Sequence, residues 1–510
     1  MSIASHAHGG SSPVWDAIGN FRRGRDAISG LDDNGLQASA SWFDPDVISL
    51  AHGEGIRRPH PSVVASGVAA LLDSKNHSLD NYLYLRRADA FEDTLIELFK
   101  SQGIPGEIAA NLGVDSGVTR LFFGFFHAVA EPGDVFLTAQ SYYQGINMWC
   151  DLAKVQLESV ETASEQDHKL TRAALERWYE RYVYTGRVRK PRGIILFNPS
   201  YTGALYDADE LAALGEFAVE QDLVVLEDAI FWRTEFPGNR SIRLASLPGM
   251  ADRVVTVDGG SKAYGLANIR IGWACGPSQI MDRINYHTMV SSMTVTSQAK
   301  TMALAALRAP AEYLEGNALE CMARAALVTE LVESVNEQVS FAVGFSPHVP
   351  FFRVAHQPKA GHSILLDGNG MRGLSLPDGN LIHDSTDVTR YFLREGKVCF
   401  SPAISNGFTD CTLRVSYGCL GSEHTYAHPQ RAETKAAARA VLRHADPLAS
   451  ETQLDHRLRQ ADIDLDWSCP DGTNDGFAAG RSLIREAFLH RIAPAAVRLA
   501  LSNKEALHAP

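Results

Sequence analysis

The sequence contains few cysteines, and they are too widely separated to form a recognisable motif. Its 510 residues include 7 cysteines, and no two of them lie fewer than eight residues apart. This spacing excludes the short Cys-x-x-Cys patterns of zinc and thioredoxin-like sites, so we expect no metal site. An odd number of scattered cysteines is typical of reduced thiols and predicts a cytoplasmic protein.

Long apolar runs and a surplus of basic residues are also missing. The most apolar segment, 121–130, is ten residues long, and the first twelve residues contain no apolar stretch. We therefore expect neither a membrane span nor a signal peptide. The chain has 47 lysines and arginines against 60 aspartates and glutamates, and this net charge of -13 disfavours nucleic acid as a partner.

The sequence does contain enough apolar material for a large core. Hydrophobic residues make up 45% of it and charged residues 21%, which excludes a disordered chain. Between about residues 42 and 440, short apolar runs alternate with amphipathic stretches, a pattern that predicts an α/β fold with a doubly wound, mostly parallel sheet. Ligands of such sheets bind beyond the carboxyl ends of the strands. The predicted strands are Val135–Leu137, Gly193–Phe197, Leu223–Leu226, Val254–Val257 and Ile271–Ala274, and the clearest helices are Glu92–Gln102 and Ala208–Glu220.

The pattern changes along the chain and predicts four parts. Long helical periodicity over 298–335, interrupted at Pro310, leads out of a large domain, and strand-like pieces after it indicate a smaller α+β domain with a surface insertion at 367–378. The polar stretch 446–475 precedes one amphipathic helix at 480–502. The predicted parts are an N-terminal arm (1–47), a large domain (48–330) whose first residues contribute to the small domain, a small domain (331–445) and a C-terminal extension (446–510).

Segment 258–273 is the most informative for chemistry. Lys262 follows an apolar strand with glycines on either side of it, and Arg270 comes eight residues later. An amine in such a crevice can act as a Schiff-base nucleophile, and the guanidinium can hold a phosphate. A lysine of this kind, taken alone, is most often a solvated residue on a turn.

Three other segments supply further parts of one site. Asp228 follows a predicted strand, where a carboxylate can keep a pyridine nitrogen protonated. Asn198 follows the preceding strand, and its amide could donate to a phenolate oxygen. The run 114–121 joins a strand to a helix, so its backbone N–H groups can hold a phosphate. Taken singly, each of these is more often a cap or an ordinary turn.

The order and spacing of these elements are specific when taken together. Asp228 lies 30 residues after Asn198, Lys262 lies 34 residues further on, and Arg270 another 8. In this arrangement the chain resembles, over about 48–440, the pyridoxal 5′-phosphate (PLP) enzymes of fold type I in the class I/II aminotransferase group. The resemblance implies a PLP cofactor, an amino-acid substrate and a homodimer.

The resemblance also implies roles for individual residues. Lys262 would bind the cofactor as a Schiff base and move the substrate Cα proton, and Arg414 would receive the substrate carboxylate. Tyr84 would reach the cofactor phosphate of a partner subunit, although Tyr82 competes for this role. The remaining cofactor contacts would be Asp228 to the pyridinium nitrogen, Asn198 to O3′, a stacked Tyr143, and a phosphate site made by Ser116, Gly117, Val118, Ser261 and Arg270.

The chain departs from the family pattern at three places. The tyrosine that usually donates to O3′, three residues after the aspartate, is Phe231 here. The serine expected three residues before the lysine is Gly259. The dipeptide Ser200–Tyr201 intervenes in the Asn-Pro-Thr-Gly motif, so the role of Asn198 depends on a shift in register.

The reaction itself remains open at this level. An aminotransferase acting on an L-α-amino acid is the main expectation. The runs 141–147 and 50–54 are similar to segments of 1-aminocyclopropane-1-carboxylate synthase, which would place Glu54 near a substrate such as S-adenosylmethionine (SAM) and favour elimination, replacement or ring closure. A regulator with an aminotransferase-like ligand domain is a third alternative, but it would require a DNA-binding domain for which the sequence gives no signal.

Overall fold

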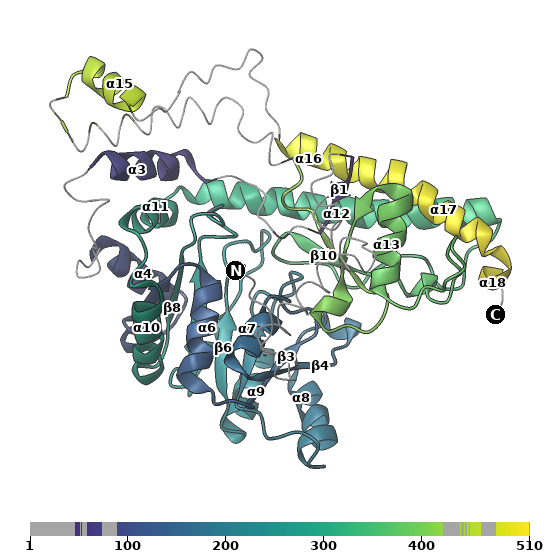
Figure 1. Cartoon of the computed structure of the whole chain (residues 1–510), viewed down its shortest axis with the longest axis horizontal. Coiled ribbons are helices and arrows are strands. Elements are labelled where there is room, and N and C mark those ends of the chain that lie inside the picture. The colour runs from purple at the N-terminus through teal and green to yellow at the C-terminus, as the bar shows by residue number, and fades with distance from the viewer. Residues whose placement is uncertain are drawn as a thin grey trace, which may run out of the picture.

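The structure is a computed structural model, and it describes most of the chain between residues 46 and 508 (Figure 1). Two predicted site residues, Glu54 and Tyr84, lie outside the described residues, as do the competing Tyr82 and nearly all of the predicted N-terminal arm. The described residues are 46–51, 53, 59–73, 89–421, 439, 443, 446–447, 449–460 and 476–508.

A seven-stranded sheet forms the centre of the large domain. Its strand order is β2-β8-β7-β6-β5-β3-β4, and all neighbours are parallel except those of β8, which runs antiparallel to both β2 and β7. This confirms the doubly wound, mostly parallel sheet that the sequence predicts. The strands are β2 (Leu112–Asp115), β3 (Val135–Ala139), β4 (Gln156–Val160), β5 (Gly193–Phe197), β6 (Val224–Asp228), β7 (Val254–Gly259) and β8 (Gly272–Cys275).

Helices cover both faces of this sheet. One face packs against α6 (Val118–Val129), α7 (Ile146–Ala153) and α10 (Ser278–Ser292) through one apolar cluster. The other face packs, through a second cluster, against α4 (Asp89–Ser101), α5 (Gly106–Ala109), α8 (Arg172–Trp178), α9 (Ala208–Glu220) and α11 (Ser297–Leu307), with α3 (Pro61–Leu72) lying on α11. Short helical turns lie at Ser164–Gln166, Tyr179–Val183 and Leu244–Ser246.

The sequence identified the buried strands more readily than the edge strand. All five predicted strands are present, but β4 was not predicted. Every described residue of β5 is buried, whereas β4 at the sheet edge is mostly exposed or half-buried. An edge strand that lacks a continuous apolar run gives little periodic signal.

A smaller domain follows a helix of 33 residues, α12 (Ala311–Val343). Pro310 immediately precedes α12, as the interrupted periodicity predicted. The domain contains α13 (Ser385–Gly396) and an antiparallel sheet in the order β12-β13-β10-β9. Its strands are β9 (Arg353–Val354), β10 (Ser363–Asp367), β11 (Val398–Cys399), β12 (Ser401–Pro402) and β13 (Leu413–Ser416), with short turns at Asn369–Met371 and Ala403–Asn406; β1 (Ile48–Ser49) pairs in parallel with β11.

The end of the chain packs along the small domain (Figure 1). Ile484, Phe488 and Ile492 are fully buried against the core of that domain. The predicted single helix at 480–502 is interrupted by a π-helical segment, because Pro494 has no N–H to donate to the preceding turn. The elements are α15 (Glu451–Gln460), α16 (Gly476–Arg485), the π-segment Glu486–Ile492, α17 (Ala493–Ser502) and α18 (Lys504–His508).

The polar stretch 367–378 is anchored rather than lying loosely on the surface. Met371 within it is fully buried, and Leu374 is nearly so. Asn503 accepts a hydrogen bond from Ser375 N (2.7 Å) and donates one to Ser375 O (3.0 Å), which joins this stretch to the end of the chain.

Within the described residues, no helix is both long and apolar enough to cross a membrane, and no three acidic, histidine or cysteine side chains cluster as metal ligands would.

Candidate active site

A cavity of about 310 Å³ lies beyond the carboxyl ends of β5, β6 and β7. The small domain contributes Arg414 from β13, and the loop after β1 contributes Ala51 and Gly53. The cavity brings together residues that are separated by up to 363 positions in the sequence, from Ala51 to Arg414. Its lining includes seven predicted site residues (Val118, Tyr143, Asp228, Ser261, Lys262, Arg270 and Arg414), together with Tyr201, Phe122, Trp149, Phe197 and Ile230.

One end of the cavity has the form of a phosphate cradle at the start of α6. A Cβ atom at Gly117 would stand 2.6 Å from Arg270 Nη2, and one at Gly272 would stand 2.6 Å from Val118 N. Both positions therefore require glycine for this close approach of backbone and guanidinium. The first N–H groups of a helix have no partner within the helix, so this end of α6 can bind an anion together with Arg270.

A buried carboxylate that the sequence did not single out holds this loop in place. Asp115 is fully buried, and it accepts hydrogen bonds from Ser116 N (2.6 Å) and from Thr288 Oγ1 on α10 (2.7 Å). Its position at the end of β2, directly before the predicted loop, was the available signal. Neither Ser116 nor Gly117 is among the residues that line the cavity, so the phosphate contact predicted for them would have to come from their backbone N–H groups.

The absence of a serine at Gly259 has a steric reason. A Cβ atom at this position would stand 3.0 Å from Ile271 O and 3.1 Å from Val118 Cγ2. A serine would therefore require small displacements of Ile271 O and Val118, because both contacts are tighter than ordinary van der Waals distance.

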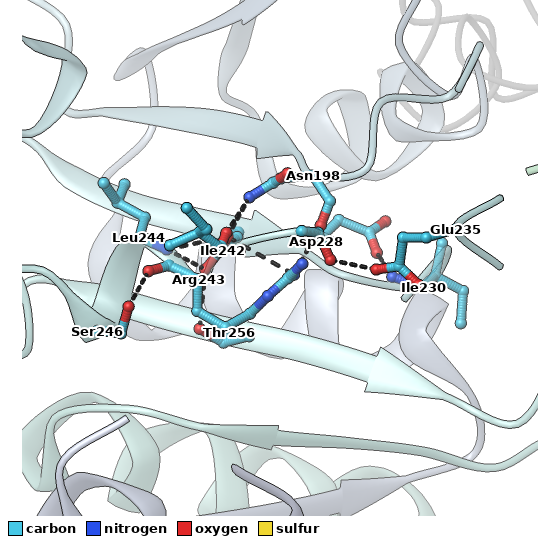
Figure 2. Close-up of polar contacts among 11 residues, drawn as sticks. Asn198, Asp228, Ile230, Glu235, Ile242, Arg243, Leu244, Ser246 and Thr256 are labelled. Atoms are coloured by element: carbon cyan, nitrogen blue, oxygen red, sulfur yellow. Dashed lines mark hydrogen bonds and ion pairs between the residues drawn. The ribbon is translucent and has the colours of Figure 1, made fainter. Parts of the chain in front are cut away.

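Asp228 is the last residue of β6 (Figure 2). It also lines the cavity. Its Oδ1 accepts a hydrogen bond from Ile230 N at 2.9 Å. Burial raises the pKa of this carboxyl to about 7, although that hydrogen bond and Lys262 both act to lower it. A cationic partner in the cavity would offset this cost of burial and keep the carboxylate ionised.

The side chain of Asn198 lies beside the cavity but does not line it. Its Nδ2 donates to Glu227 Oε1 (3.0 Å) and to Ile242 O (2.6 Å), so both amide hydrogens have partners in the protein (Figure 2). The expected contact from this amide to O3′ therefore remains a prediction, and the observed geometry directs the amide elsewhere.

A buried ion pair that the sequence did not reveal lies behind Asp228. Arg243 and Glu227 are almost fully buried, with 3.6 Å between Nη1 and Oε1. Glu227 also accepts hydrogen bonds from Leu244 N (3.1 Å) and Thr256 Oγ1 (3.2 Å), and Arg243 donates to Asn198 O at 2.6 Å. This network joins the residues of β6 and β7 to Asn198 at the end of β5, next to Asp228 (Figure 2).

Lys262 reaches the cavity from the loop after β7. Its Nζ donates to Gly53 O at 2.5 Å and lies 6.0 Å from the ring centroid of Phe231. The sequence did not single out His362, which contacts the same carbonyl at 2.9 Å. Burial and the nearby Lys262 lower the pKa of His362 to about 3, so this imidazole is neutral and its Nε2 donates to Gly53 O.

Arg414 presents unused donors to the cavity. Its Nη2 donates to Ala51 O at 2.7 Å, and the guanidinium lies over the Tyr201 ring at 4.7 Å. Its Nε and Nη1 are buried without a hydrogen-bond partner among the described residues. A buried guanidinium with two free donors fits a carboxylate ligand, because the pair can form bidentate hydrogen bonds.

The cavity thus has a suitable donor set for PLP: a phosphate cradle, a buried carboxylate for the pyridine nitrogen, and an amine. Tyr143, 37% exposed, forms part of the aromatic wall, with its ring centroid 5.7 Å from that of Tyr201.

Comparison with known proteins agrees with this geometry. The family described as aminotransferase class I and II matches residues 45–428. A probable aspartate/prephenate aminotransferase of Rickettsia conorii is 24% identical over 375 residues, which cover 73% of this chain and 86% of the relative. A bifunctional aspartate aminotransferase and glutamate/aspartate-prephenate aminotransferase of Petunia hybrida is 25% identical over 373 residues, 73% of each chain.

Solved structures show the same fold. The aspartate aminotransferase from Rhizobium meliloti superposes with a TM-score of 0.65 at 18% identity, and the alignment covers 92% of this chain and 99% of that one. The N-succinyldiaminopimelate aminotransferase from Mycobacterium tuberculosis superposes with a TM-score of 0.62 over 83% of this chain and 95% of that one, also at 18% identity.

These findings support the aminotransferase expectation and not the SAM-utilising alternative. They also confirm the fold type I scaffold, for which PLP is the family cofactor. The chain belongs to the class I and II aminotransferase family and is a PLP-dependent transferase.

Proposed function

We propose that this aminotransferase removes the amino group of an L-α-amino acid in the cavity around Lys262, as a homodimer. The observation that supports this most directly is the convergence of Asp228, Lys262, Arg270 and Arg414 on one cavity although they come from both domains. PLP, when bound, supplies an electron sink for the substrate Cα.

The residues around the cavity have separate roles in binding and proton transfer. Arg414 binds and orients the substrate carboxylate through its buried Nε and Nη1. Lys262 would hold the cofactor covalently through Nζ, and its amine, once released from the cofactor, would accept the proton that leaves Cα, because it is the basic group at the centre of the cavity. Asp228 keeps the cofactor ring protonated, and Arg270 with the start of α6 holds the phosphate.

The relatives named for aspartate, glutamate and prephenate suggest that aspartate and glutamate should be tested first as amino donors, with prephenate among the 2-oxo acid acceptors. Apart from Lys262, Arg270 and Arg414, no cationic side chain lines the cavity within the described residues. A second substrate carboxylate would therefore need a cation from the undescribed residues or from the partner subunit.

The homodimer is supported by an apolar stripe on α10. Tyr286, Met289 and Val290 follow helical spacing on α10, Met293 comes directly after its last residue, and these four side chains are between 46% and 63% exposed. Contiguous exposed apolar side chains of this kind indicate a covered surface, and we assign a second copy of the chain as its partner. Sedimentation should give a dimer, and Val290→Lys should shift it towards monomer; a wild-type monomer at micromolar concentration would contradict the assignment.

The central test uses Lys262→Ala. We expect the visible absorbance of lysine-bound cofactor to disappear and transamination of an amino-acid panel to fall by at least about 10³-fold, because both covalent binding and proton transfer are lost. The panel should be followed by mass spectrometry of the oxo acids formed. Retained turnover in the variant would overturn the assignment of this cavity.

A further inference from the structure

The departure at Phe231 leaves the cavity without the phenol that the family pattern places there. Phe231 is 2% exposed, and its ring packs against Tyr201 (centroids 5.8 Å apart) and His362 (5.3 Å). A hydrocarbon ring cannot donate a hydrogen bond, and the Asn198 amide is already used by Glu227 and Ile242. Neither expected donor to a phenolate oxygen is therefore available from these two positions.

Tyr201 supplies a phenol at the same wall of the cavity. It belongs to the dipeptide Ser200–Tyr201 that intervenes in the family motif, it is 7% exposed, and it lines the cavity. A Cβ atom built on Gly53 would stand 3.4 Å from Tyr201 Oη, 3.8 Å from Lys262 Nζ and 3.8 Å from Arg414 Nη1, so these three groups converge on Gly53. The Tyr201 hydroxyl makes no hydrogen bond within the described residues.

The turn that carries Tyr201 is firmly held. Ser200 N donates to Ala204 O, and Ser200 Oγ accepts from Ala204 N, both at 2.9 Å. Gly203 lies so close to the small-domain loop that a Cβ atom there would stand 2.2 Å from Ala360 O. The Arg414 guanidinium covers one face of the Tyr201 ring, which further limits its rotation.

We propose that the Tyr201 hydroxyl donates a hydrogen bond to the phenolate oxygen O3′ of PLP and so replaces the phenol missing at Phe231. The inference rests on the proposed function, because it requires PLP to be bound at Lys262. The motif spacing does not identify Tyr201 as a residue that contacts the cofactor, because the family pattern places the two donors at the positions of Asn198 and Phe231.

Titration of the visible spectrum tests this without any turnover. A hydrogen bond donated to O3′ stabilises the phenolate. The phenolate then stabilises the protonated Schiff base of Lys262 less strongly, so the pKa of that Schiff base is lower. In Tyr201→Phe we expect the midpoint of the absorbance change with pH to rise by about one unit and PLP to dissociate about tenfold faster. Tyr142→Phe is the matched control, because Tyr142 is buried nearby but its hydroxyl donates to Asn147 at 3.1 Å.

A second variant separates the hydrogen bond from packing. Adding Phe231→Tyr to Tyr201→Phe should return the midpoint towards that of the wild type, because it places a phenol at the neighbouring ring. An unchanged midpoint in folded, cofactor-loaded Tyr201→Phe would overturn the inference, and so would a shift that Phe231→Tyr does not reverse. A wild-type protein without Lys262-dependent absorbance would instead overturn the proposed function.

Discussion

Glu227 and Asp228 are adjacent carboxylates on β6, and both are buried, yet their surroundings differ completely. Successive side chains of a strand point to opposite faces, so the two carboxylates leave the strand in opposite directions. Glu227 meets Arg243, Asn198, Leu244 N and Thr256. Asp228 meets one backbone N–H and the cavity.

The comparison distinguishes a carboxylate that stabilises the fold from a carboxylate that is available to a ligand in the cavity. The partners of Glu227 are all provided by the protein, so its charge is compensated in the folded chain itself. Asp228 lacks such partners, and burial raises its pKa to about 7. A buried group whose pKa is shifted in this way is a candidate for binding a ligand or taking part in its reaction. The comparison therefore predicts that Asp228 affects activity, while Glu227 affects stability.

The largest expected effect is on activity, in Asp228→Asn. The neutral amide cannot hold a pyridinium nitrogen, so we expect a loss on the order of 10²–10³ in kcat/KM, which is about 2.7–4 kcal/mol of transition-state stabilisation. The cofactor-free variant should be at least as stable as the wild type near pH 8, because no charge is then buried at position 228. Steady-state kinetics and denaturant unfolding provide the two measurements, and a destabilised but active variant would reverse the comparison.

Glu227→Gln should affect stability instead. Removing one charge leaves Arg243 buried without its counter-ion, and such breakage typically costs about 3–5 kcal/mol of unfolding free energy. Glu216→Gln is the matched control, because this carboxylate is 71% exposed and its pairing with Arg172 should be worth less than about 1 kcal/mol. Equal unfolding free energies for the two variants would contradict a structural role for Glu227.

The pH dependence of stability should provide a further test of the difference between Asp228 and Glu227. Burial raises the pKa values of Asp228 and of the neighbouring Asp258 to about 7, from about 4 in an unfolded chain. Between these values the folded cofactor-free protein binds more protons than the unfolded one. Its unfolding free energy should therefore fall as pH rises from about 4 to about 7, by up to about 1.4 kcal/mol per pH unit for each carboxyl.

Above pH 7 this contribution should be lost and the dependence on these two groups should become flat. Asp228→Asn should reduce the slope and leave the part due to Asp258. Denaturant unfolding at several pH values checks this, and an unaltered slope in the variant would show that Asp228 does not titrate in that window.

The smallest expected effect is that of Thr256→Val. This change removes one of the hydrogen bonds to Glu227, at 3.2 Å, and keeps the side-chain shape. We expect a loss of about 1 kcal/mol in unfolding free energy with kcat/KM unchanged. A clear loss of activity would mean that the buried network also positions the cavity.

The local sequence was sufficient for groups whose position at a strand or helix end is itself the signal. Asp228 and Lys262 follow apolar strands, Arg270 comes eight residues after Lys262, and the structure brings all three to one cavity. Asn198 has the same kind of signal, but its amide faces Glu227. A position at a strand end therefore indicates proximity to a site, while the direction of the side chain depends on partners from distant segments.

The site residues that the sequence did not identify have no comparable signal in their local sequence. Arg243 and His362 lie outside any recognisable motif, and Gly53 contributes only its carbonyl oxygen. Tyr201 appeared only as an irregularity in a motif. Each matters because of what packs against it from a different part of the chain, over separations of 45 to more than 300 residues.

The sequence by itself determined the α/β class, the family and the order of the elements that supply Asp228, Lys262 and Arg270 to the cavity, because strand alternation and motif spacing are local properties of the chain. Only the tertiary structure decided which of two adjacent carboxylates faces the cavity, where the Asn198 amide points, and which phenol lies beside Lys262. These outcomes depend on how helices and the small domain pack around the sheet, and that packing involves contacts that no local pattern encodes.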